Sequence, residues 1–438
     1  MIRSITIEDF KSYEQATLSL SPLTFLIGAN ASGKSNALEA IRLLSWLSKG
    51  RRLDDIARSI QGEDNLVRGQ AGDLFRFDCS SLTIECGLLD MPEGWDNLRL
   101  TISLLEDNLI ISDEMITKGE QADEVPLYRI DSKANPHTDE VSVLYNNFSR
   151  GRNKPHIPCS NRLAIFYQLE TPSRFDKRHE KSQKLIPVVA KRVRESLRQI
   201  IFLDPRPNRM RDYAFEKNRE IEEDGSNLSG VLYDICSEPD GRKELLLDFI
   251  RSLPEQDISD VRFITTERRD VMVKLVESFG GQEREVPSPL LSDGTLRVLA
   301  IAAALLSAPE GALVIIEEID NGVHPSRAEL LVKQIQSVSE KRNLRVLVTT
   351  HNPALLDSLP DNALGDVLCC YRDDETGNSR VVRLGDMDQY PELVARGTLG
   401  ELVTNRTLDR YLKDKRSVDT QMQRSLQFLE EYQQELSR

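Results

Sequence analysis

A glycine-bearing loop near the amino terminus holds the residues whose types and spacing are best suited to chemistry. Residues 28–35 read Gly-Ala-Asn-Ala-Ser-Gly-Lys-Ser and fit the pattern Gly-x4-Gly-Lys-Ser, which is typical of loops that hold nucleotide phosphates. Glycines let the backbone curl so that successive N–H groups point at one anion, and a following helix adds its positive end. In such a loop Lys34 would reach the β- and γ-phosphates, and the Ser35 hydroxyl would hold Mg²⁺. The residues expected around the phosphates are Asn30, Ala31, Ser32, Gly33, Lys34, Ser35 and Asn36.

Two neighbouring carboxylates and a histidine also follow apolar runs. Glu317 and Glu318 come directly after residues 311–316, and His351 comes directly after residues 345–350. Buried parallel strands would place these side chains at the carboxyl edge of a sheet, where ligands bind in open α/β sheets. The alternatives are a chance pair of surface glutamates and a histidine that only caps its strand.

The segments around the glycine-bearing loop are those that such a site needs. Residues 23–27 form a short apolar run, as a buried parallel strand requires, and residues 36–44 have helical apolar spacing. A turn that matches the pattern by chance is therefore disfavoured, since strand, loop and helix occur in the required order.

The composition is that of a globular chain with an acidic surface. Of 438 residues 29% are charged and 39% are hydrophobic, and the net charge is −14. No stretch reaches the roughly 18 apolar residues of a membrane span, and the first residues lack the apolar core of a signal peptide. We therefore expect a cytoplasmic protein without a membrane partner. The six cysteines form no Cys-x-x-Cys pair, so buried reduced thiols are expected rather than disulfides or a zinc site.

Several motifs in a fixed order resemble the heads of ABC-type ATPases of the SMC and RecF group. Residues 9–13, Asp-Phe-Lys-Ser-Tyr, precede the phosphate loop. Residues 291–295, Leu-Ser-Asp-Gly-Thr, are similar to the family signature Leu-Ser-Gly-Gly-Gln, with Asp293 and Thr295 as departures. The Glu pair stands at the Walker B position, and His351 stands at the switch histidine. The nearest group is that of bacterial predicted ATPases related to OLD-family proteins, many of them anti-phage defence subunits.

The resemblance implies a role for each matching residue. Lys11 and Ser12 would lie near the nucleotide, and Ser292 and Gly294 would complete the site of a second protomer. Glu317, which replaces the usual aspartate, would hold Mg²⁺ through water, although its extra methylene leaves the metal geometry open. Glu318 would orient or deprotonate the attacking water.

Two further residues receive roles from the resemblance. His351 would contact the γ-phosphate. Gln168, after a short apolar run, would contact Mg²⁺ and the attacking water; a solvated glutamine is the alternative.

These observations predict an α/β fold, a P-loop NTPase of the ABC head type, in which a mixed sheet is joined to an antiparallel β subdomain and carries an inserted helical lobe. The expected divisions are residues 1–170 with the phosphate loop and antiparallel sheet, 171–284 as helical insert, 285–400 with signature, Walker B and histidine, and 401–438 as C-terminal helix. An apolar stripe from Val418 to Leu436 would dock on the chain's own head, on a second protomer or on an effector.

The predicted function is ATP binding and hydrolysis by a switch subunit. Two or more copies would close around ATP and control a separate, nuclease-like effector in anti-phage defence. The alternative is a RecF-like DNA-binding repair ATPase that uses residues 191–211, because residues 171–220 hold 14 Lys and Arg against seven Asp and Glu. A solvated helix and an ion-paired loop would explain the same charges. A transporter subunit is disfavoured by the signature departures.

Overall fold

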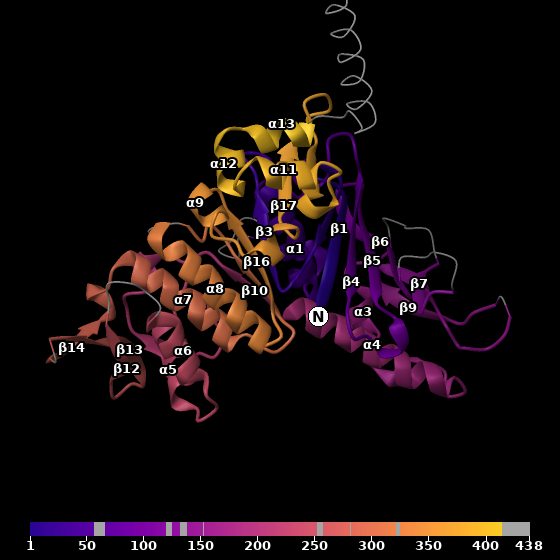
Figure 1. Cartoon of the computed structure of the whole chain (residues 1–438). Helices are drawn as coiled ribbons and strands as arrows, with labels where there is room; N and C mark the ends of the chain where they lie inside the picture. Colours follow the sequence, from indigo (N-terminus) through magenta and orange to yellow (C-terminus); the bar gives the residue numbers. More distant parts are fainter. Residues whose placement is uncertain are drawn as a thin grey trace, which may run out of the picture.

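The computed structural model describes residues 1–56, 66–119, 125–131, 138–151, 153–251, 257–280, 282–320 and 325–413. Within these ranges, fourteen strands form one continuous sheet (Figure 1). One end of this sheet is parallel. Its strands, in spatial order, are β10 (Ile200–Leu203), β15 (Leu313–Ile316), β16 (Arg345–Thr350), β3 (Leu23–Ile27) and β17 (Leu368–Arg372).

The sheet continues as a mainly antiparallel block. After β17 come β18 (Ser379–Arg383), β2 (Tyr13–Ser19), β1 (Ile2–Phe10), β4 (Ser81–Leu88), β5 (Asn97–Leu105), β6 (Asn108–Thr117), β7 (Tyr128–Ile130), β8 (Glu140–Tyr145) and β9 (His156–Ser160). The only parallel contact within this block joins β18 and β2, through Ser379 and Tyr13. The mixed sheet with an antiparallel subdomain is thus as predicted.

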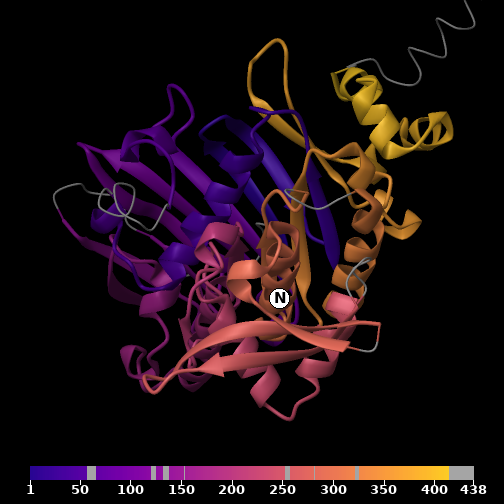
Figure 2. The ribbon, with the colours of Figure 1, turned by 90° about the vertical axis from the view of Figure 1, so that its left-hand side faces the viewer.

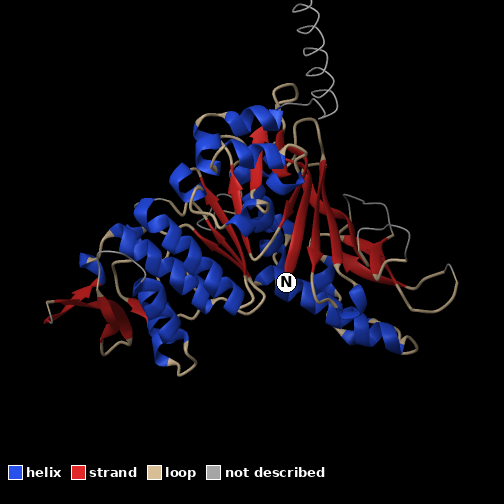
Figure 3. Cartoon of the chain, viewed as in Figure 1, coloured by secondary structure: helices blue, strands red, loops and turns tan. Residues whose placement is uncertain are grey.

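Helices cover both faces of the parallel block. Leu313 and Ile315 of β15 belong to the core that packs on α1 (Lys34–Ser48), while Val314 and Ile316 belong to the core of α7 (Asp293–Ser307) and α8 (Pro325–Lys341). Burial on both faces explains why this strand is apolar at every position. Figure 3 shows α7 and α8 packed along one side of the parallel strands.

The segment expected as a helical lobe is only partly helical. It contains α4 (Glu180–Arg198), α5 (Leu228–Ser237) and α6 (Arg242–Arg251), but also strand β10 of the main sheet. It further supplies most of a second, four-stranded sheet of β11 (Ala214–Phe215), β12 (Ile258–Thr265), β13 (Asp270–Phe279) and β14 (Gln282–Pro287). β13 is rich in β-branched and other apolar residues, and Val271, Met272, Val273, Leu275 and Val276 are buried. In Figure 2 this sheet lies at the bottom of the molecule, far from the C-terminal helices.

Five short helices follow β16 in the described part of the chain. They are α9 (Pro353–Leu356), α10 (Asp361–Leu364), α11 (Tyr390–Arg396), α12 (Leu399–Thr404) and α13 (Thr407–Lys413), and α3 (Ile165–Gln168) lies under the antiparallel block. Single 3-10 turns occupy Leu53–Asp55, Ala71–Leu74, Pro92–Gly94, Pro172–Arg174, Pro207–Arg209, Ser288–Leu290 and Leu384–Asp386. The predicted stripe from Val418 to Leu436 lies outside the described residues.

The cysteines and the helix lengths bear on two further expectations from the sequence. All six cysteines are free; four are buried, as expected, whereas Cys79 and Cys236 are partly exposed. Within the described ranges, each helix is either too short or too polar to cross a lipid bilayer.

Candidate functional site

The phosphate loop joins β3 to α1 at the carboxyl edge of the parallel block. Gly28 has φ 152° and Gly33 has φ 120°, a region that residues with a side chain rarely enter. A Cβ on Gly28 would lie 2.1 Å from the Cys370 carbonyl oxygen, and one on Gly33 would lie 2.4 Å from the Ser379 hydroxyl. Both glycines are therefore required by the close approach of β17 and β18, as well as by the curl of the loop.

Two buried residues beneath the phosphate loop, which the sequence did not indicate as site residues, contact its backbone. The Cys370 thiol donates a hydrogen bond to the Ser32 carbonyl at 3.2 Å and lies 3.2 Å from the Tyr13 hydroxyl. All three residues are buried. Tyr13 and Cys370 are distant from the loop in sequence, so only the pairing of β2, β18, β17 and β3 reveals their common place.

A cavity of about 610 Å³, which we call the phosphate cavity, gathers most of the predicted nucleotide residues. It is lined by Lys11, Ser12, Asn30, Ala31, Ser32, Gly33, Lys34, Ser35, Asn36, Arg68, Glu318 and Arg372. The Asn36 amide donates to the Ser12 hydroxyl at 2.8 Å, which joins the turn after β1 to the start of α1. The structure thus brings Lys11, Ser12 and the loop together.

A buried carboxylate on α1 holds the cations at one side of the phosphate cavity. Glu39 forms ion pairs with Lys11 and, at 2.6 Å, with Arg68. The Lys11 ammonium also donates to the Arg68 carbonyl at 2.7 Å. Glu39 and Arg68 carried no signal of their own in the sequence, because their pairing depends on helix α1 facing the turn after β1.

Lys34 lies at the centre of the loop with its ammonium on the loop backbone. It donates to the carbonyl oxygens of Gly28 at 2.6 Å and Ala29 at 3.1 Å. Burial lowers the pKa of Lys34, while nearby Cys370 and the carboxylates of Glu318 and Asp320 act in the opposite direction. The electrostatic contact with both acids shows that the Walker B end is close to the loop.

The two adjacent glutamates point to different places. Glu318 lines the phosphate cavity and has φ 47°, and its N–H donates to the Thr349 hydroxyl at 2.9 Å. A positive φ in a residue with a side chain is uncommon and is found at sites where neighbours fix the backbone. This turn sends the Glu318 side chain to the loop.

Glu317 instead faces helix α1. Its carboxylate accepts from Arg42 at 2.9 Å, and Arg42 also makes two bonds of 2.6 Å to Glu223 and covers the Phe202 ring at 4.2 Å. Burial raises the pKa of Glu317, and the Arg42 guanidinium opposes that effect. Glu317 does not line the phosphate cavity, so a metal role for it would compete with this ion pair.

His351 lies beside the loop but opens into a different cavity, lined also by Asn30, Ala31 and Ser32. Its side chain is 56% exposed, and its Nε2 lies 3.6 Å from the Asp320 carboxylate, which is buried. Thr350 donates to the same carboxylate at 2.7 Å. His351 is thus at the tip of the loop, while Lys34 and Glu318 lie in the phosphate cavity.

The signature residues lie away from the chain's own loop. Ser292 caps α7 by accepting from the Thr295 N–H at 3.1 Å, and neither Ser292 nor Gly294 lines the phosphate cavity. The preceding backbone is held by Arg211, which donates to the carbonyls of residues 288, 289 and 291 and to the Asp293 carboxylate at 2.6 Å. Ser292 is exposed.

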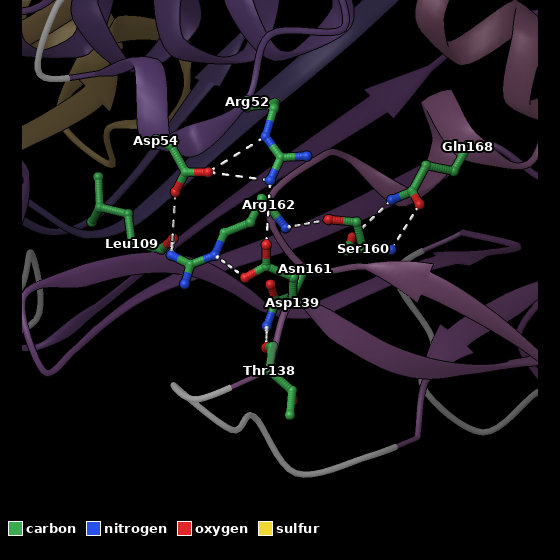
Figure 4. Close-up of polar contacts among 9 residues, drawn as sticks. All are labelled: Arg52, Asp54, Leu109, Thr138, Asp139, Ser160, Asn161, Arg162 and Gln168. Atoms are coloured by element: carbon green, nitrogen blue, oxygen red, sulfur yellow. Dashed lines mark hydrogen bonds and ion pairs between the residues drawn. The ribbon is translucent and has the colours of Figure 1, made fainter.

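The expectation that Gln168 contacts Mg²⁺ is wrong. Its side chain accepts from the Ser160 N–H at 2.8 Å and donates to the Ser160 carbonyl at 2.8 Å (Figure 4). It also donates to the Leu163 carbonyl at 2.7 Å. Tyr167 packs where a side chain on Gly50 would be, at the end of α1 opposite to the loop. Gln168 therefore satisfies the backbone of the turn before α3, and the apolar run that precedes it is this short helix.

The arginines of the basic turn after β10 have acidic or backbone partners. Arg206 pairs with Asp204 at 3.5 Å and Arg209 pairs with Asp224 at 3.3 Å, in addition to the Arg211 contacts. These contacts agree with the interpretation that the basic residues of this turn form an ion-paired loop, which was the alternative to nucleic-acid binding.

Comparison with known proteins identifies the class of protein that this fold and site define. Residues 1–224 match the family described as "AAA ATPase domain", and residues 136–357 match the family described as "AAA domain, putative AbiEii toxin, Type IV TA system". Each match covers about half of the chain. The protein is an ATPase with a head of the SMC and RecF type.

The chain belongs to the AAA ATPase domain family. It is 23% identical over 369 residues to an ATP/GTP phosphatase of Helicobacter pylori, covering 82% of this chain and 87% of that protein. It is 44% identical over 64 residues to the DNA replication and repair protein RecF of Gloeobacter violaceus, covering 14% of this chain and 17% of RecF. The SMC head bound to the C-terminal winged-helix domain of ScpA aligns with 87% of this chain and 96% of its own, at 13% identity and a TM-score of 0.47.

Proposed function

We propose that this ATPase is a switch subunit in which two copies close around two ATP molecules. Each site would combine Lys34, Ser35 and Glu318 of one copy with Ser292 of the other. The observation that carries the proposal is the separation within one chain: the phosphate cavity holds the first three residues, whereas Ser292 is exposed at the start of α7. Two such chains would complete each other.

Each group in the phosphate cavity has a suitable chemical task. The loop N–H groups and the ammonium of Lys34 would bind the β- and γ-phosphates, because they present positive charge to the oxygens that gain charge during transfer. Glu318 would accept a proton from the attacking water, and His351 at the loop tip would donate a hydrogen bond to the γ-phosphate. Hydrolysis would give ADP and phosphate.

The residues fit a magnesium ion in part. Mg²⁺ prefers oxygen donors and usually keeps several waters, and the Ser35 hydroxyl and the Glu318 carboxylate line the same cavity. Ser35 would hold the ion, with Glu317 acting through water when its carboxylate is not taken by Arg42. When bound, Mg²⁺ supplies neutralising charge to the phosphates.

Glu318→Gln tests the chemistry of a single site. The variant should retain ATP binding and lose turnover by roughly 100-fold or more, the usual contribution of a general base. The control is Glu180→Gln, whose side chain is 80% exposed on α4, and which should turn over at the wild-type rate. Equal rates for wild type and Glu318→Gln would remove Glu318 from the mechanism.

Mixing two inactive variants tests whether sites are shared. Lys34→Ala and Ser292→Arg should each be inactive alone. In a one-to-one mixture, half of the dimers would contain one intact site, so about a quarter of the wild-type rate should return. A mixture that stays inactive, although size-exclusion chromatography shows mixed dimers with ATP, would refute a site built from two chains.

We further propose that closure controls a separate, nuclease-like effector protein in the cytoplasm of a bacterium that defends itself against phage. The support is the family description, which names a toxin and a type IV toxin–antitoxin system. Affinity purification from the native host should recover the effector with the Glu318→Gln variant in ATP but not with Lys34→Ala. If the effector is recovered equally well with Lys34→Ala, then ATP binding at the phosphate loop does not control effector binding, and the proposal is wrong.

The RecF relatives favour a second candidate, a DNA-binding repair ATPase. Residues 191–211 would then contact backbone phosphates, and binding would weaken steeply with salt. Changing Arg206 and Arg209 to Ala tests this without touching Arg211, which holds the signature. Loss of salt-sensitive DNA binding would support this candidate, and unchanged binding would exclude this segment as the contact.

A further inference from the structure

A second cavity, of about 470 Å³, lies at the tip of the phosphate loop and is closed by the C-terminal helices. We call it the C-terminal cavity. Its walls come from the loop, β17, α9, α12 and α13, and it shares Asn30, Ala31, Ser32 and Arg372 with the phosphate cavity. Its volume falls within the range of about 300–1,000 Å³ that is usual for small-molecule sites.

The helices that close this cavity are fixed against the head. The Gly400 N–H of α12 donates to the Asp357 carboxylate at 2.6 Å, and a Cβ on Gly400 would lie 2.3 Å from the Pro353 carbonyl. α13 is tied to the hairpin after β17 by the ion pair between Lys413 and Asp374 at 2.9 Å. The cavity is therefore held open between anchored elements.

The chemistry of the lining is of two kinds. Apolar side chains form most of the wall, and they are Ile27, Leu356, Val403, Leu408 and Leu412. Two guanidinium groups, Arg372 and Arg406, lie on the same wall, and neither has an acidic partner among the residues that the structure describes. Asp409 and Lys413 also line the cavity but pair with each other at 3.5 Å.

We propose that the C-terminal cavity binds an organic anion with a flat apolar body, in addition to the nucleotide held by the phosphate loop. The apolar wall would cover an aromatic ring, and the two guanidinium groups would take a phosphate, sulfonate or carboxylate, the groups that their planar donors match best. The phosphate cavity differs in that it holds Lys34, Ser35 and Glu318 and has none of the apolar side chains of α9, α12 and α13. The C-terminal cavity borders the nucleotide site, because His351, Asn30, Ala31 and Ser32 line it, but Lys34, Ser35 and Glu318 do not.

Fluorescence titration with 8-anilinonaphthalene-1-sulfonate tests the site, because this probe combines aromatic rings with one anionic group. Wild-type full-length protein should bind one probe per chain with enhanced emission. Val403→Trp, which places an indole in the cavity, should weaken binding by about tenfold or more, and Arg406→Gln should weaken it by about fivefold. The matched control is Val394→Trp on α11, where the valine is 47% exposed and outside the cavity.

The phosphate cavity is the competing location for the probe. Lys34→Ala should leave probe binding unchanged, and equal thermal midpoints should show that all variants fold. The proposal is wrong if wild type binds no probe, or if Val403→Trp binds as tightly as wild type. It is also wrong if Lys34→Ala loses the probe while Val403→Trp retains it.

Discussion

A buried glutamate in the antiparallel block should make the stability of this protein depend on pH. Glu114 of β6 is fully buried, and its carboxylate accepts three hydrogen bonds of 2.7 Å, from the Tyr128 hydroxyl and from the N–H groups of Ile165 and Phe166. It therefore joins β6 and β7 to the start of α3. Burial raises the pKa of Glu114 to about 7, although its three donors act in the opposite direction.

The sign of the effect follows from the direction of the shift. The folded protein holds the Glu114 proton more tightly than the unfolded chain, whose pKa is near the ordinary value of 4.5. The proton therefore stabilises the fold at low pH, and this stability is lost as pH rises through about 7. The full effect is about 3 kcal/mol, of which about 2 kcal/mol falls between roughly pH 5.5 and pH 8.

Replacing Glu114 by Gln removes this titration. The amide keeps one oxygen for two of the donors, but its NH₂ group must face the third N–H, at a cost of about 1–3 kcal/mol. We expect the variant to be less stable than wild type near pH 5.5, and the difference to shrink by about 2 kcal/mol near pH 8. Urea unfolding at both pH values measures the difference, with Glu180→Gln as an exposed control. A difference that stays constant with pH would refute the raised pKa.

Three other substitutions follow from single contacts. Arg211→Ala releases the backbone before the signature, so turnover should fall by about tenfold while ATP affinity in a filter assay stays unchanged. Arg211→Lys should not restore turnover, because one ammonium cannot replace a guanidinium that contacts three carbonyls and a carboxylate. Arg42→Ala leaves the partly buried carboxylates of Glu223 and Glu317 without their cation and should lower the free energy of unfolding by about 1–3 kcal/mol. Urea unfolding measures this loss, which should be smaller in high salt because salt screens the ion pairs. Gln168→Ala should reduce stability by about 1–2 kcal/mol and leave turnover per folded molecule at the wild-type value, whereas a lower turnover would return Gln168 to the site.

Local pattern was sufficient for the parts of the site that are continuous in sequence. The strand, phosphate loop and helix of residues 23–48 occur where predicted, because glycine spacing and apolar runs act over a few residues. The same holds for β15 and β16, which place Glu318 and His351 next to the loop. β15 is apolar at every position and β3 at all but one, since helices cover both faces, whereas β16 ends in two threonines.

Other features were wrong or missing because their cause is not local. Gln168 follows an apolar run as a site residue would, but Ser160 and Leu163 offered backbone partners that only the fold of β9 and α3 creates. The strands of the second sheet stand in a segment whose neighbours are helical, and each strand needs its partners before it buries a face.

The sequence by itself determined which groups can bind phosphate and that they follow strands of a parallel sheet. The reason is that a curled backbone requires glycines at fixed spacing and a buried strand requires a run of apolar residues, and both patterns extend over only a few residues. The tertiary structure alone decided where each side chain points. It turned Glu318 to the loop and Glu317 to Arg42, placed Tyr13 and Cys370 beneath Ser32, and set Ser292 apart from its own loop. The physical reason is that these contacts join segments between 31 and 357 residues apart, and their geometry is fixed by strand order and helix packing rather than by neighbouring residues.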